Sequence, residues 1–516
     1  MEKIIETDVA IIGAGPTGLS LACQLVRYGV DFVIVEKNEA ITPYSKALGV
    51  HARTLEIYEQ LGVAGKALER GEVAKKFRLL EGGEVRGEIH LADIGKNLSP
   101  YPFMLILEQS KNEQLLYEYL QGHGKEVLWS TELESFSQDA EGVRVMVKNA
   151  EGYKTIRAKY LAGCDGARSP VRHALGLSFE GSTFERIFYV ADAQVDWALP
   201  HDALQVCLAR DVFTAFFPMK GEKRYRIVGT FPEGVDKDEG DVVYEEIEEQ
   251  IKREAKLELE ISDVQWFSLY KVHTRRVNKF SEGRCFVAGD AAHIHSPAGA
   301  QGMNTGIQDA YNLAWKLAFV LKGRADEKLL ETYNEERVEN AQRLLETTDR
   351  MFELGAGSNW LMSFIRTTIF PPVAGFLVSF DIVKRTIFPL ISQIGINYRD
   401  NSLSDHSGDE DFDVRAGDRM PYFLIDGESI YDRLREPKFH LLLFSNGESD
   451  AAVCGKLERA YDGLLDCHAV PITARVKEIF GTSEAFNVLL RPDNYIGFIS
   501  KDSVDGVKEY LRRFIK

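Results

Sequence analysis

A glycine-rich turn close to the N-terminus constrains the fold more than any other feature of this chain. It follows an apolar run from Asp8 to Ile12 and opens a helical pattern that continues to Tyr28. A second apolar run, Phe32 to Val35, ends at Glu36. In such a strand–turn–helix–strand unit, glycines allow the close approach of a pyrophosphate, the helix N-terminus stabilises its charge, and the acid accepts a ribose hydroxyl. The sequence therefore predicts a Rossmann-like dinucleotide site formed by Gly13, Gly15, Pro16, Thr17, Gly18, Glu36 and Lys37.

A Gly-Asp pair in the second half of the chain indicates which dinucleotide is bound. Arg284 to Ala288 is predicted to form a short buried strand, and Gly289 and Asp290 follow it directly. A carboxylate at this place can accept a hydrogen bond from a ribityl hydroxyl, and nicotinamide nucleotides contain no ribityl chain. The two motifs together therefore predict FAD as the cofactor and Asp290 as one of its ligands.

The segment after this pair carries little side-chain bulk. It runs from Ser296 to Gly306 and precedes an apolar helix that we predict from Ile307 to Leu321. Backbone amides near the start of that helix could approach a planar ring, and the positive helix end would stabilise the negative charge of a reduced flavin. The residues expected to contribute are Gly302, Met303 and Asn304.

A third motif lies between the other two. Asp165 and Gly166 follow a predicted strand and precede a short helix. Ser169 is suited to cap this helix and Pro170 to be its first residue, while Gly176 would end it. Taken alone, this motif indicates only turn chemistry.

The three motifs in this order resemble those of the group A flavoprotein monooxygenases. These are FAD-dependent aromatic hydroxylases similar to para-hydroxybenzoate hydroxylase, phenol hydroxylase and the rifamycin and polyketide hydroxylases. The resemblance implies that NADPH or NADH reduces FAD, and that a C4a-hydroperoxyflavin formed with O2 inserts one oxygen atom into a phenolic substrate, with polyketides and aromatic antibiotics among the candidates. The similarity covers nearly the whole chain and includes residues 47–56, 108–110, 283–284, 414–421 and 490–493.

The resemblance also assigns roles to residues outside the motifs. Gln109 matches a glutamine that contacts the sugar and phosphate region of FAD, and Lys46 stands where the family commonly has arginine beside the flavin phosphates. Lysine is a point charge and not a bidentate fork, so its way of holding phosphates stays open. The backbone carbonyl of Pro297 matches one near the substrate hydroxyl, and no general base is identified. Independently, Ser110 to Glu113 matches a capping box that would start a helix directly after Gln109.

The positions of the motifs predict a discontinuous α/β architecture. In the family the C-terminal domain is thioredoxin-like, and here it lacks the CxxC motif needed for thiol exchange. We expect an FAD-binding domain at 1–76, 101–179 and 272–325, a substrate-binding sheet domain at 77–100 and 180–271, a helical segment at 326–398, and a thioredoxin-like domain without redox cysteines at 399–516.

Two strands are expected inside the substrate-binding sheet, at Val212 to Phe217 and at Arg224 to Thr230. Because successive side chains of a strand point to opposite faces, Phe213 and Phe217 would share one face and Phe216 would lie on the other. One of these faces could line a substrate pocket, and a plain sheet core explains the aromatic residues equally well.

Composition excludes several other classes of protein. The net charge of −17, with no basic tract, argues against nucleic acid as a partner. The six cysteines form no CxxC or CxxxxC pair, which excludes the redox-disulfide flavoprotein reductases. His293 and His295 lack the further ligands of a metal shell, so no metal is expected. Charges and prolines interrupt the apolar stretch from Trp360 to Ile396, which favours packing helices over a membrane span.

The N-terminus has no features of a signal peptide, so a cytoplasmic location is expected. Two alternatives to hydroxylation stay open: an FAD-dependent oxidoreductase that inserts no oxygen, and a flavin-binding sensor or scaffold without turnover. A flavin-dependent halogenase is disfavoured because none of the tryptophans forms a WxWxIP signature. The choice of NADH or NADPH, the identity of the aromatic substrate and a homodimeric state stay open as well.

Overall fold

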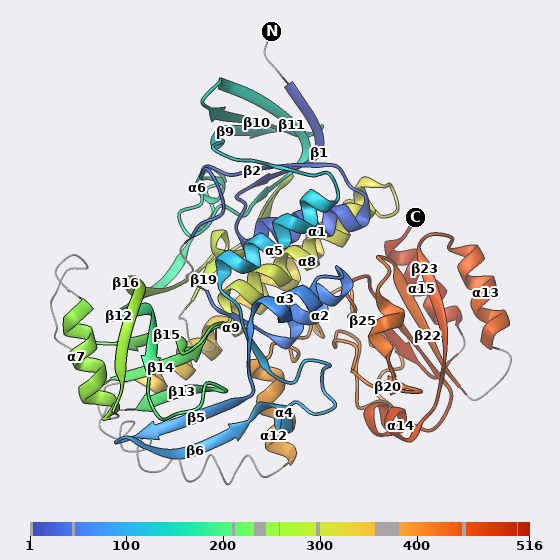
Figure 1. The fold of residues 1–516 in the computed structure, drawn as a ribbon. Coiled ribbons are helices and arrows are strands. Elements are labelled where there is room, and N and C mark those ends of the chain that lie inside the picture. The colour runs from blue at the N-terminus through green and yellow to red at the C-terminus, as the bar shows by residue number, and fades with distance from the viewer. Residues whose placement is uncertain are drawn as a thin grey trace.

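The computed structural model describes residues 4–43, 47–208, 212–231, 244–256, 258–295, 300–356, 381–445, 450–502 and 504–516. The described chain is organised around two eight-stranded sheets and one four-stranded sheet. Figure 1 shows the first sheet at the top, the second at the lower left and the C-terminal unit at the right.

The first sheet is centred on strand β1 (Ile4–Ile12), the end of which is buried. Strand β1 runs parallel to β2 (Phe32–Val35) on one side and to β11 (Gly152–Gly163) on the other. Apolar runs of this kind are typical of parallel strands covered on both faces. The strand order is β17 (Ser281–Glu282), β18 (Cys285–Val287), β11, β1, β2 and β8 (Val127–Leu128), and β10 (Val143–Asn149) and β9 (Glu132–Gln138) extend β11 as an antiparallel ribbon.

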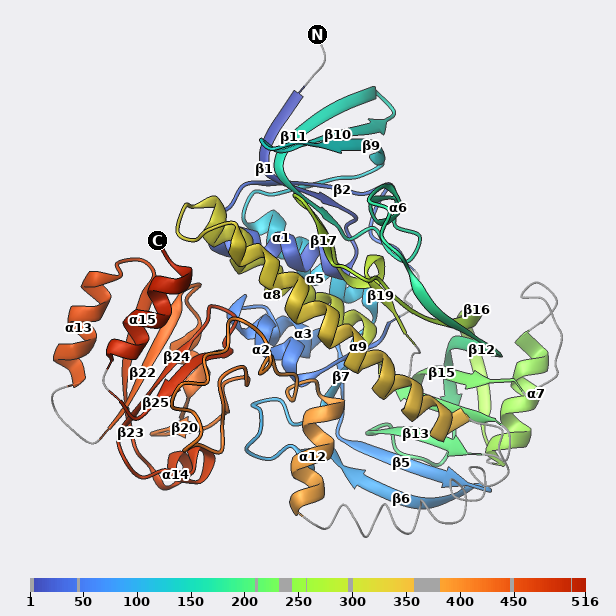
Figure 2. The same ribbon diagram turned by 180° about the vertical axis from the view of Figure 1, so that it is seen from behind.

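Three helices pack together beside this sheet: α1 (Pro16–Tyr28), α5 (Gln109–Gly122) and α8 (Gly302–Leu321). Helix α8 is buried along almost its whole length and begins at Gly302, five residues before the predicted start. Its first turn contains glycines and an asparagine, which are weak helix formers, but tertiary contacts override that tendency. Figure 2 shows the long helix α9 (Lys328–Ala356) running beside α8 through the middle of the molecule.

Shorter elements connect the first sheet to the rest of the chain. Helix α6 (Pro170–Ala174) is capped by Ser169, the hydroxyl of which accepts a hydrogen bond from the Arg172 N–H, as predicted. The others are α2 (Ala52–Gln60), α3 (Ala64–Arg70), α4 (Leu91–Ile94), α12 (Asp381–Ile391) and the small sheet β3 (Gly49–Val50), β7 (Met104–Ile106) and β4 (Glu72–Ala74). Helix α12 lies in the segment where we predicted packing helices, whereas residues 357–380 lie outside the described residues. Within the described ranges, no helix has both the length and the apolar character required to span a membrane.

The second sheet has one face covered by helix α7 (Tyr244–Ala255). Ile247 and Ile251 of this helix pack with Phe216 and Ile227 of the sheet. The alternate residues of these strands therefore lie on the opposite face. The strand order is β19 (His293–Ile294), β16 (Glu260–Arg276), β12 (Glu180–Asp196), β15 (Arg224–Thr230), β14 (Phe213–Pro218), β13 (Ala203–Leu208), β5 (Lys76–Glu81) and β6 (Glu84–His90).

The C-terminal unit contains a four-stranded mixed sheet in the order β23 (Leu465–Pro471), β22 (Phe439–Ser445), β24 (Phe486–Leu490) and β25 (Ile496–Ser500). Strands β22 and β23 are parallel, and the other two pairs are antiparallel. Helices α13 (Asp450–Ala460), α14 (Ala474–Phe480) and α15 (Asp505–Phe514) alternate with these strands along the chain, and a short ribbon, β20 (Leu424–Ile425) and β21 (Glu428–Ser429), precedes them.

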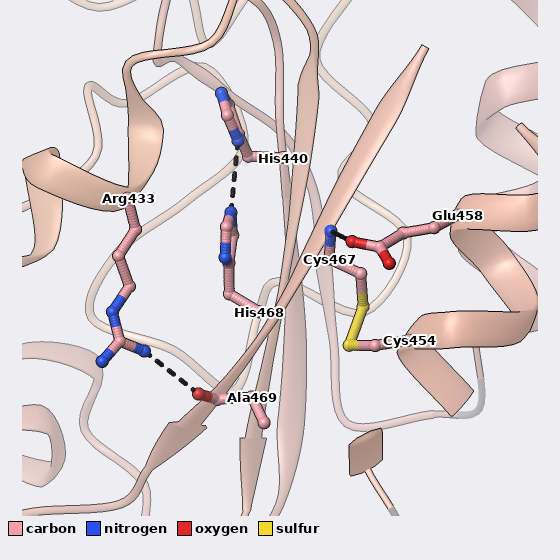
Figure 3. Close-up of a disulfide and its surroundings, with 7 residues drawn as sticks. All are labelled: Arg433, His440, Cys454, Glu458, Cys467, His468 and Ala469. Atoms are coloured by element: carbon pink, nitrogen blue, oxygen red, sulfur yellow. Dashed lines mark hydrogen bonds between the residues drawn. A yellow bond between two sulfur atoms is a disulfide. The ribbon is translucent and has the colours of Figure 1, made fainter. Parts of the chain in front are cut away.

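A disulfide bond between Cys454 of α13 and Cys467 of β23 was not predicted. Figure 3 shows it bridging the helix and the strand, while His440 and His468 form a separate stacked pair. The pairing escaped prediction because a separation of 13 residues matches neither CxxC nor CxxxxC. The other four cysteines are buried and free, and burial raises the pKa of each thiol. The spacing and burial of the disulfide indicate a structural link between helix and strand.

Four buried charges join the C-terminal unit to the long helices. Lys316 of α8 lies 2.7 Å from Glu336 of α9, which also accepts hydrogen bonds from Arg491. Arg491 in turn pairs with Asp493 at 2.6 Å. The four side chains are 0–1% exposed and their charges sum to zero. We refer to them as the buried charge quartet.

Candidate active site

Three turns meet at one edge of the first sheet. Ile12 of β1 is in register with Gly163 of β11, and Gly163 is in register with Val287 of β18. The carboxyl ends of three neighbouring parallel strands are therefore level, which is where ligands bind in open α/β sheets. The turns that follow these strands contain the three sequence motifs, Gly13 to Gly18, Asp165-Gly166 and Gly289-Asp290.

Glycine is required where the first two turns touch. A Cβ on Gly13 would lie 2.4 Å from the carbonyl oxygen of Cys164, and one on Gly18 would lie 2.0 Å from the carbonyl oxygen of Gly13. Gly13 also has a φ of +100°, which disfavours any residue with a side chain. The fingerprint turn and the Asp165 turn therefore fit together only because these positions are glycine.

The third turn closes on the same helix from the other side. A Cβ on Gly289 would lie 2.4 Å from Thr17 Oγ1, and a Cβ on Gly306 of α8 would lie 2.3 Å from the same oxygen. Thr17, Gly289 and Gly306 are thus in mutual contact, although the first is more than 250 residues from the others. The N-terminal fingerprint and the downstream Gly-Asp motif therefore lie side by side. This is the arrangement expected if the two motifs form a single site.

The fingerprint turn has the features of a phosphate cradle. A Cβ on Gly15 would meet no atom within 4 Å, so space is open at this position. Helix α1 begins after Gly15 with Pro16 in its first turn and without a side-chain cap among the described residues, so its first amides are free to bind an anion. Glu36 stands beside this turn, where its carboxylate accepts a hydrogen bond from the Ala14 N–H at 2.8 Å, and Lys37 is exposed.

The start of α8 has the same character. Gln301 precedes the helix without capping it by its side chain, so the amides of Gly302, Met303 and Asn304 have no helical carbonyl to bind. The Asn304 side chain points elsewhere: its Oδ1 accepts hydrogen bonds from the His51 N–H at 2.9 Å and the Thr54 hydroxyl at 2.7 Å. Asn304 can therefore offer a ligand only its backbone, while its side chain fixes the segment before α2.

Gln109 is held between two segments. Its side-chain oxygen accepts a hydrogen bond from the Ala47 N–H at 3.2 Å, and its amide group donates to Glu113 at 2.8 Å. The prediction of a capping box was wrong, because α5 begins at Gln109 with Glu108 as the N-cap and no side-chain cap there. The Gln109 N–H also donates to the Ala47 carbonyl, which draws the residue into the first helical turn.

Two carboxyl groups near these turns have altered acidity. Burial, with Glu36 close by, raises the pKa of Glu113 to about 7. Burial also raises the pKa of Asp165. One Asp165 oxygen accepts a hydrogen bond from the Val171 N–H at 3.0 Å, and the other has no partner among the described residues. Asp290 is exposed at the tip of its turn, and Lys46 and Pro297 lie outside the described residues.

A row of four side chains crosses the second sheet on the face opposite α7. Phe217, Arg226, Asp192 and Trp266 are in register on four neighbouring strands. Arg226 makes two hydrogen bonds of 2.7 Å to Asp192 and lies 5.3 Å from the Trp266 ring centre. This face contacts the segment that precedes β3, because Arg226 also donates to the Ala47 carbonyl and Phe217 packs on the cluster around Leu48.

A second aromatic group lies farther along the same face. Phe188 stacks on Tyr270 with ring centres 5.6 Å apart and meets Phe213 edge-on at 6.2 Å. Phe213, Phe217, Trp266 and Tyr270 are only partly buried. The face therefore presents aromatic surface and one buried ion pair toward the segment that starts at Ala47.

Comparison with known proteins decides the family. The FAD binding domain family matches residues 6–348. A flavin-dependent monooxygenase from Mycobacteroides abscessus is 34% identical, covering 98% of this chain and 100% of that protein. The chain belongs to the FAD-dependent aromatic monooxygenases. The 6-methylpretetramide 4-monooxygenase of Streptomyces rimosus is 32% identical over 95% of this chain and 90% of its own length. The solved structure of OxyS anhydrotetracycline hydroxylase from Streptomyces rimosus superposes with a TM-score of 0.76 at 28% identity, covering 99% of both chains.

The site residues of this monooxygenase fit FAD, its cofactor. Two helix starts without a side-chain cap, those of α1 and α8, present amides of the kind that bind an anionic group. Carboxylates stand near both, Glu36 at the fingerprint and Asp290 at the distal turn. The donor and acceptor groups at the three turns are therefore of the kinds that FAD requires.

Sequence reasoning missed several residues that shape this site. Asp309 of α8 and Arg337 of α9 form a buried pair behind the Gly289 turn, and Arg226 with Asp192 forms another on the sheet. The charge of Asp309 inside a largely apolar helix, which also contains Lys316, was the available signal. The Arg226 pairing had no local signal, since its partner lies 34 residues away on another strand.

Proposed function

We propose that this monooxygenase uses NAD(P)H and O2 to place one hydroxyl group on a fused-ring phenol. The row of Phe217, Arg226, Asp192 and Trp266 carries the substrate part of the proposal. Broad aromatic surface suits a flat polycyclic ring, and a single ion pair within it suits a few polar substituents. The names of the relatives from Streptomyces rimosus, both of which refer to tetracyclic compounds, agree with a substrate of this shape.

We propose the following arrangement of residues around FAD. Glu36 binds the adenosine ribose, the α1 amides bind the pyrophosphate, and Asp290 binds the ribityl chain, while the amides of Gly302, Met303 and Asn304 face the ring. The open space at Gly15 and the uncapped starts of α1 and α8 support this assignment. The remaining expected contacts are made by Gly13, Pro16, Thr17, Gly18, Lys37, Lys46, Gln109 and Asp165.

The protein groups contribute orientation and electrostatics. When bound, FAD accepts a hydride from NAD(P)H and activates O2 for the transfer of one oxygen atom. The amides at the start of α8 stabilise negative charge on the reduced ring, since they have no helical carbonyl to bind and lie at the positive end of the helix. The apolar sheet face excludes water from the reacting atoms. The Pro297 carbonyl is proposed, on the family resemblance, to lie near the substrate hydroxyl.

We also propose the domain assignment made from the sequence, with an FAD-binding domain, a substrate-binding sheet domain, a helical segment, and a thioredoxin-like domain at 399–516. The strand order β23, β22, β24, β25, with only the first pair parallel, supports the last assignment. A cytoplasmic location, where NAD(P)H is available, and a homodimer belong to the same proposal. Native mass spectrometry of the holoenzyme tests the dimer.

The test of the proposed function is NAD(P)H oxidation by the yellow protein with a panel of phenols under ¹⁸O2. Substrate-stimulated oxidation with one labelled oxygen atom in the product supports hydroxylation. Turnover without label would point to an oxidoreductase that inserts no oxygen, and absence of flavin reduction under every condition would point to a sensor or scaffold.

The assignment of Asp290 is tested separately. Asp290→Ala should retain FAD less well than the unchanged protein, because a charge-assisted hydrogen bond to the ribityl chain is lost. Equal FAD affinity in the two proteins would remove Asp290 from the site.

A further inference from the structure

Asp309 of α8 is a completely buried carboxylate directly behind the Gly289–Asp290 turn. Its Oδ2 accepts hydrogen bonds from the Gly289 N–H at 2.9 Å and from His293 Nε2 at 2.8 Å. Its Oδ1 lies 2.6 Å from the guanidinium of Arg337. One carboxylate therefore binds both ends of the five-residue segment that contains Asp290.

Arg337 is itself fixed in place. It is fully buried on α9, donates a hydrogen bond to the Tyr398 hydroxyl at 2.7 Å, and reaches the Thr305 carbonyl at 3.5 Å. The fork of the guanidinium thus holds Asp309, the first turns of α8 and the chain at Tyr398 together. Such a pair is costly to desolvate and is maintained only with good geometry on both sides.

The carboxylate keeps its charge. Burial would raise the pKa of Asp309, but the neighbouring Arg337 and His293 outweigh that effect and hold the pKa below its usual range. A charged acceptor binds the Gly289 N–H more strongly than a neutral one. This matters because Gly289 has a φ of +61° and touches Thr17, so the turn has little freedom to adjust elsewhere.

We propose that Asp309 is a positioning residue of the flavin site: it locks the Gly289–Asp290 turn onto α8, so that the Asp290 carboxylate and the amides at the start of α8 address a single FAD molecule. The inference rests on the proposed assignment of Asp290 to FAD. Asp309 is buried and acts through Gly289, whereas Asp290 is exposed.

The test compares the FAD dissociation constants of apoproteins, measured by titration. Asp309→Asn offers one acceptor atom instead of two and places an amide donor against existing donors. It should raise the dissociation constant tenfold or more. Glu336→Gln is the matched control, because Glu336 is an equally buried and paired carboxylate in the charge quartet, away from Gly289. Its dissociation constant should stay within twofold of the unchanged protein.

Unfolding of the same apoproteins with and without FAD separates positioning from a general loss of stability. A structural role alone would lower the unfolding midpoint of both variants and leave unchanged the increase in that midpoint on adding FAD. A positioning role reduces that rise in Asp309→Asn only. The proposal is overturned if Asp309→Asn binds FAD within twofold of the unchanged protein, or if Glu336→Gln weakens binding equally.

Arg337→Lys covers the case in which Asp309→Asn does not fold. It keeps the buried charge but loses the planar fork that reaches Asp309, Tyr398 and the Thr305 carbonyl from three separate nitrogens. It should raise the FAD dissociation constant at least threefold, and no change would overturn the proposal. Asp290→Ala distinguishes the two levels of failure. If Asp290→Ala weakens FAD binding and the Asp309 and Arg337 variants do not, only the positioning role fails, and if none of them does, the assignment of Asp290 fails first.

Discussion

Replacing Gly306 with alanine tests the contact between the fingerprint helix α1 and helix α8. A Cβ at this position would lie 2.3 Å from Thr17 Oγ1 and 3.1 Å from the Gly289 Cα. Overpacking of this kind costs ~1–3 kcal/mol. Alanine also has a better helix propensity than glycine by ~1 kcal/mol. We therefore expect Gly306→Ala to lower the free energy of unfolding of the apoprotein by up to about 2 kcal/mol and to weaken FAD binding, because α8 must move away from the turn.

A second substitution isolates this contact. Thr17→Ala removes Oγ1, so that the nearest remaining atoms to the added methyl group are the Gly289 Cα at 3.1 Å and the Thr17 Cβ at 3.6 Å. In that background Gly306→Ala should cost clearly less than in the unchanged protein, and the double-mutant cycle should give a coupling of ~1–3 kcal/mol. Thr17→Val is the matched control. It keeps the shape of threonine and should leave the cost of Gly306→Ala unchanged.

The assay is thermal unfolding of the apoproteins side by side, together with FAD titration of each. A change of 1 kcal/mol shifts the midpoint by about 2–4 °C in domains of 150–250 residues. Additivity of the two substitutions within about 0.5 kcal/mol would show that Thr17 and Gly306 do not touch. It would also refute the convergence of the two motifs on one site.

Three further predictions concern other parts of the chain. Glu113→Gln should be more stable than the unchanged protein above pH 7. The pKa of Glu113 is about 7 in the folded protein and 4.5 ordinarily. The unchanged protein therefore loses up to about 3 kcal/mol of its free energy of unfolding as the pH rises from 4.5 through 7. Denaturation midpoints of both proteins from pH 5 to 8 check this, and parallel curves would contradict it. Trp266→Ala should raise the KM for the phenolic substrate about tenfold, because ~1.4 kcal/mol of aromatic contact is lost. FAD affinity should change less than twofold. An unchanged KM would place the substrate elsewhere. Cys454→Ala should lower the stability of the C-terminal unit by ~3 kcal/mol, the value for closing a loop of similar length. It should leave FAD affinity unaltered, since α13 lies at the outer side of that unit (Figure 1). A large loss of FAD affinity would assign the disulfide a wider role.

The elements around the fingerprint could be predicted closely from the sequence. Strand β2 matches its predicted bounds, and α1 begins one residue before its predicted start. These elements are specified locally, by apolar runs and by glycines at the turn. The capping of α6 by Ser169 followed from equally local chemistry. Family resemblance and turn chemistry together were sufficient to indicate the cofactor.

What could not be predicted depends on contacts between distant segments. Nothing near Asn304 indicates that its side chain binds His51 and Thr54, about 250 residues earlier. Ala47 draws Gln109 into α5 and thereby moves the helix start, although the local sequence favours Ser110 as the cap. The alternation of Phe216 and Phe217 separated the two faces of their strand. Only the tertiary packing shows that the Phe216 face is covered by α7 and that Phe217 packs against Leu48.

The buried charge quartet has a consequence for exchanging parts between relatives. Arg491 and Asp493 come from the C-terminal unit, whereas Lys316 and Glu336 come from α8 and α9. Deleting or grafting the C-terminal unit alone would remove Arg491 and Asp493 from this quartet, leave the Lys316–Glu336 pair without its further partners, and leave Trp315 without its acceptor. Chimeras that fold stably should therefore inherit both halves of the buried charge quartet from the same parent.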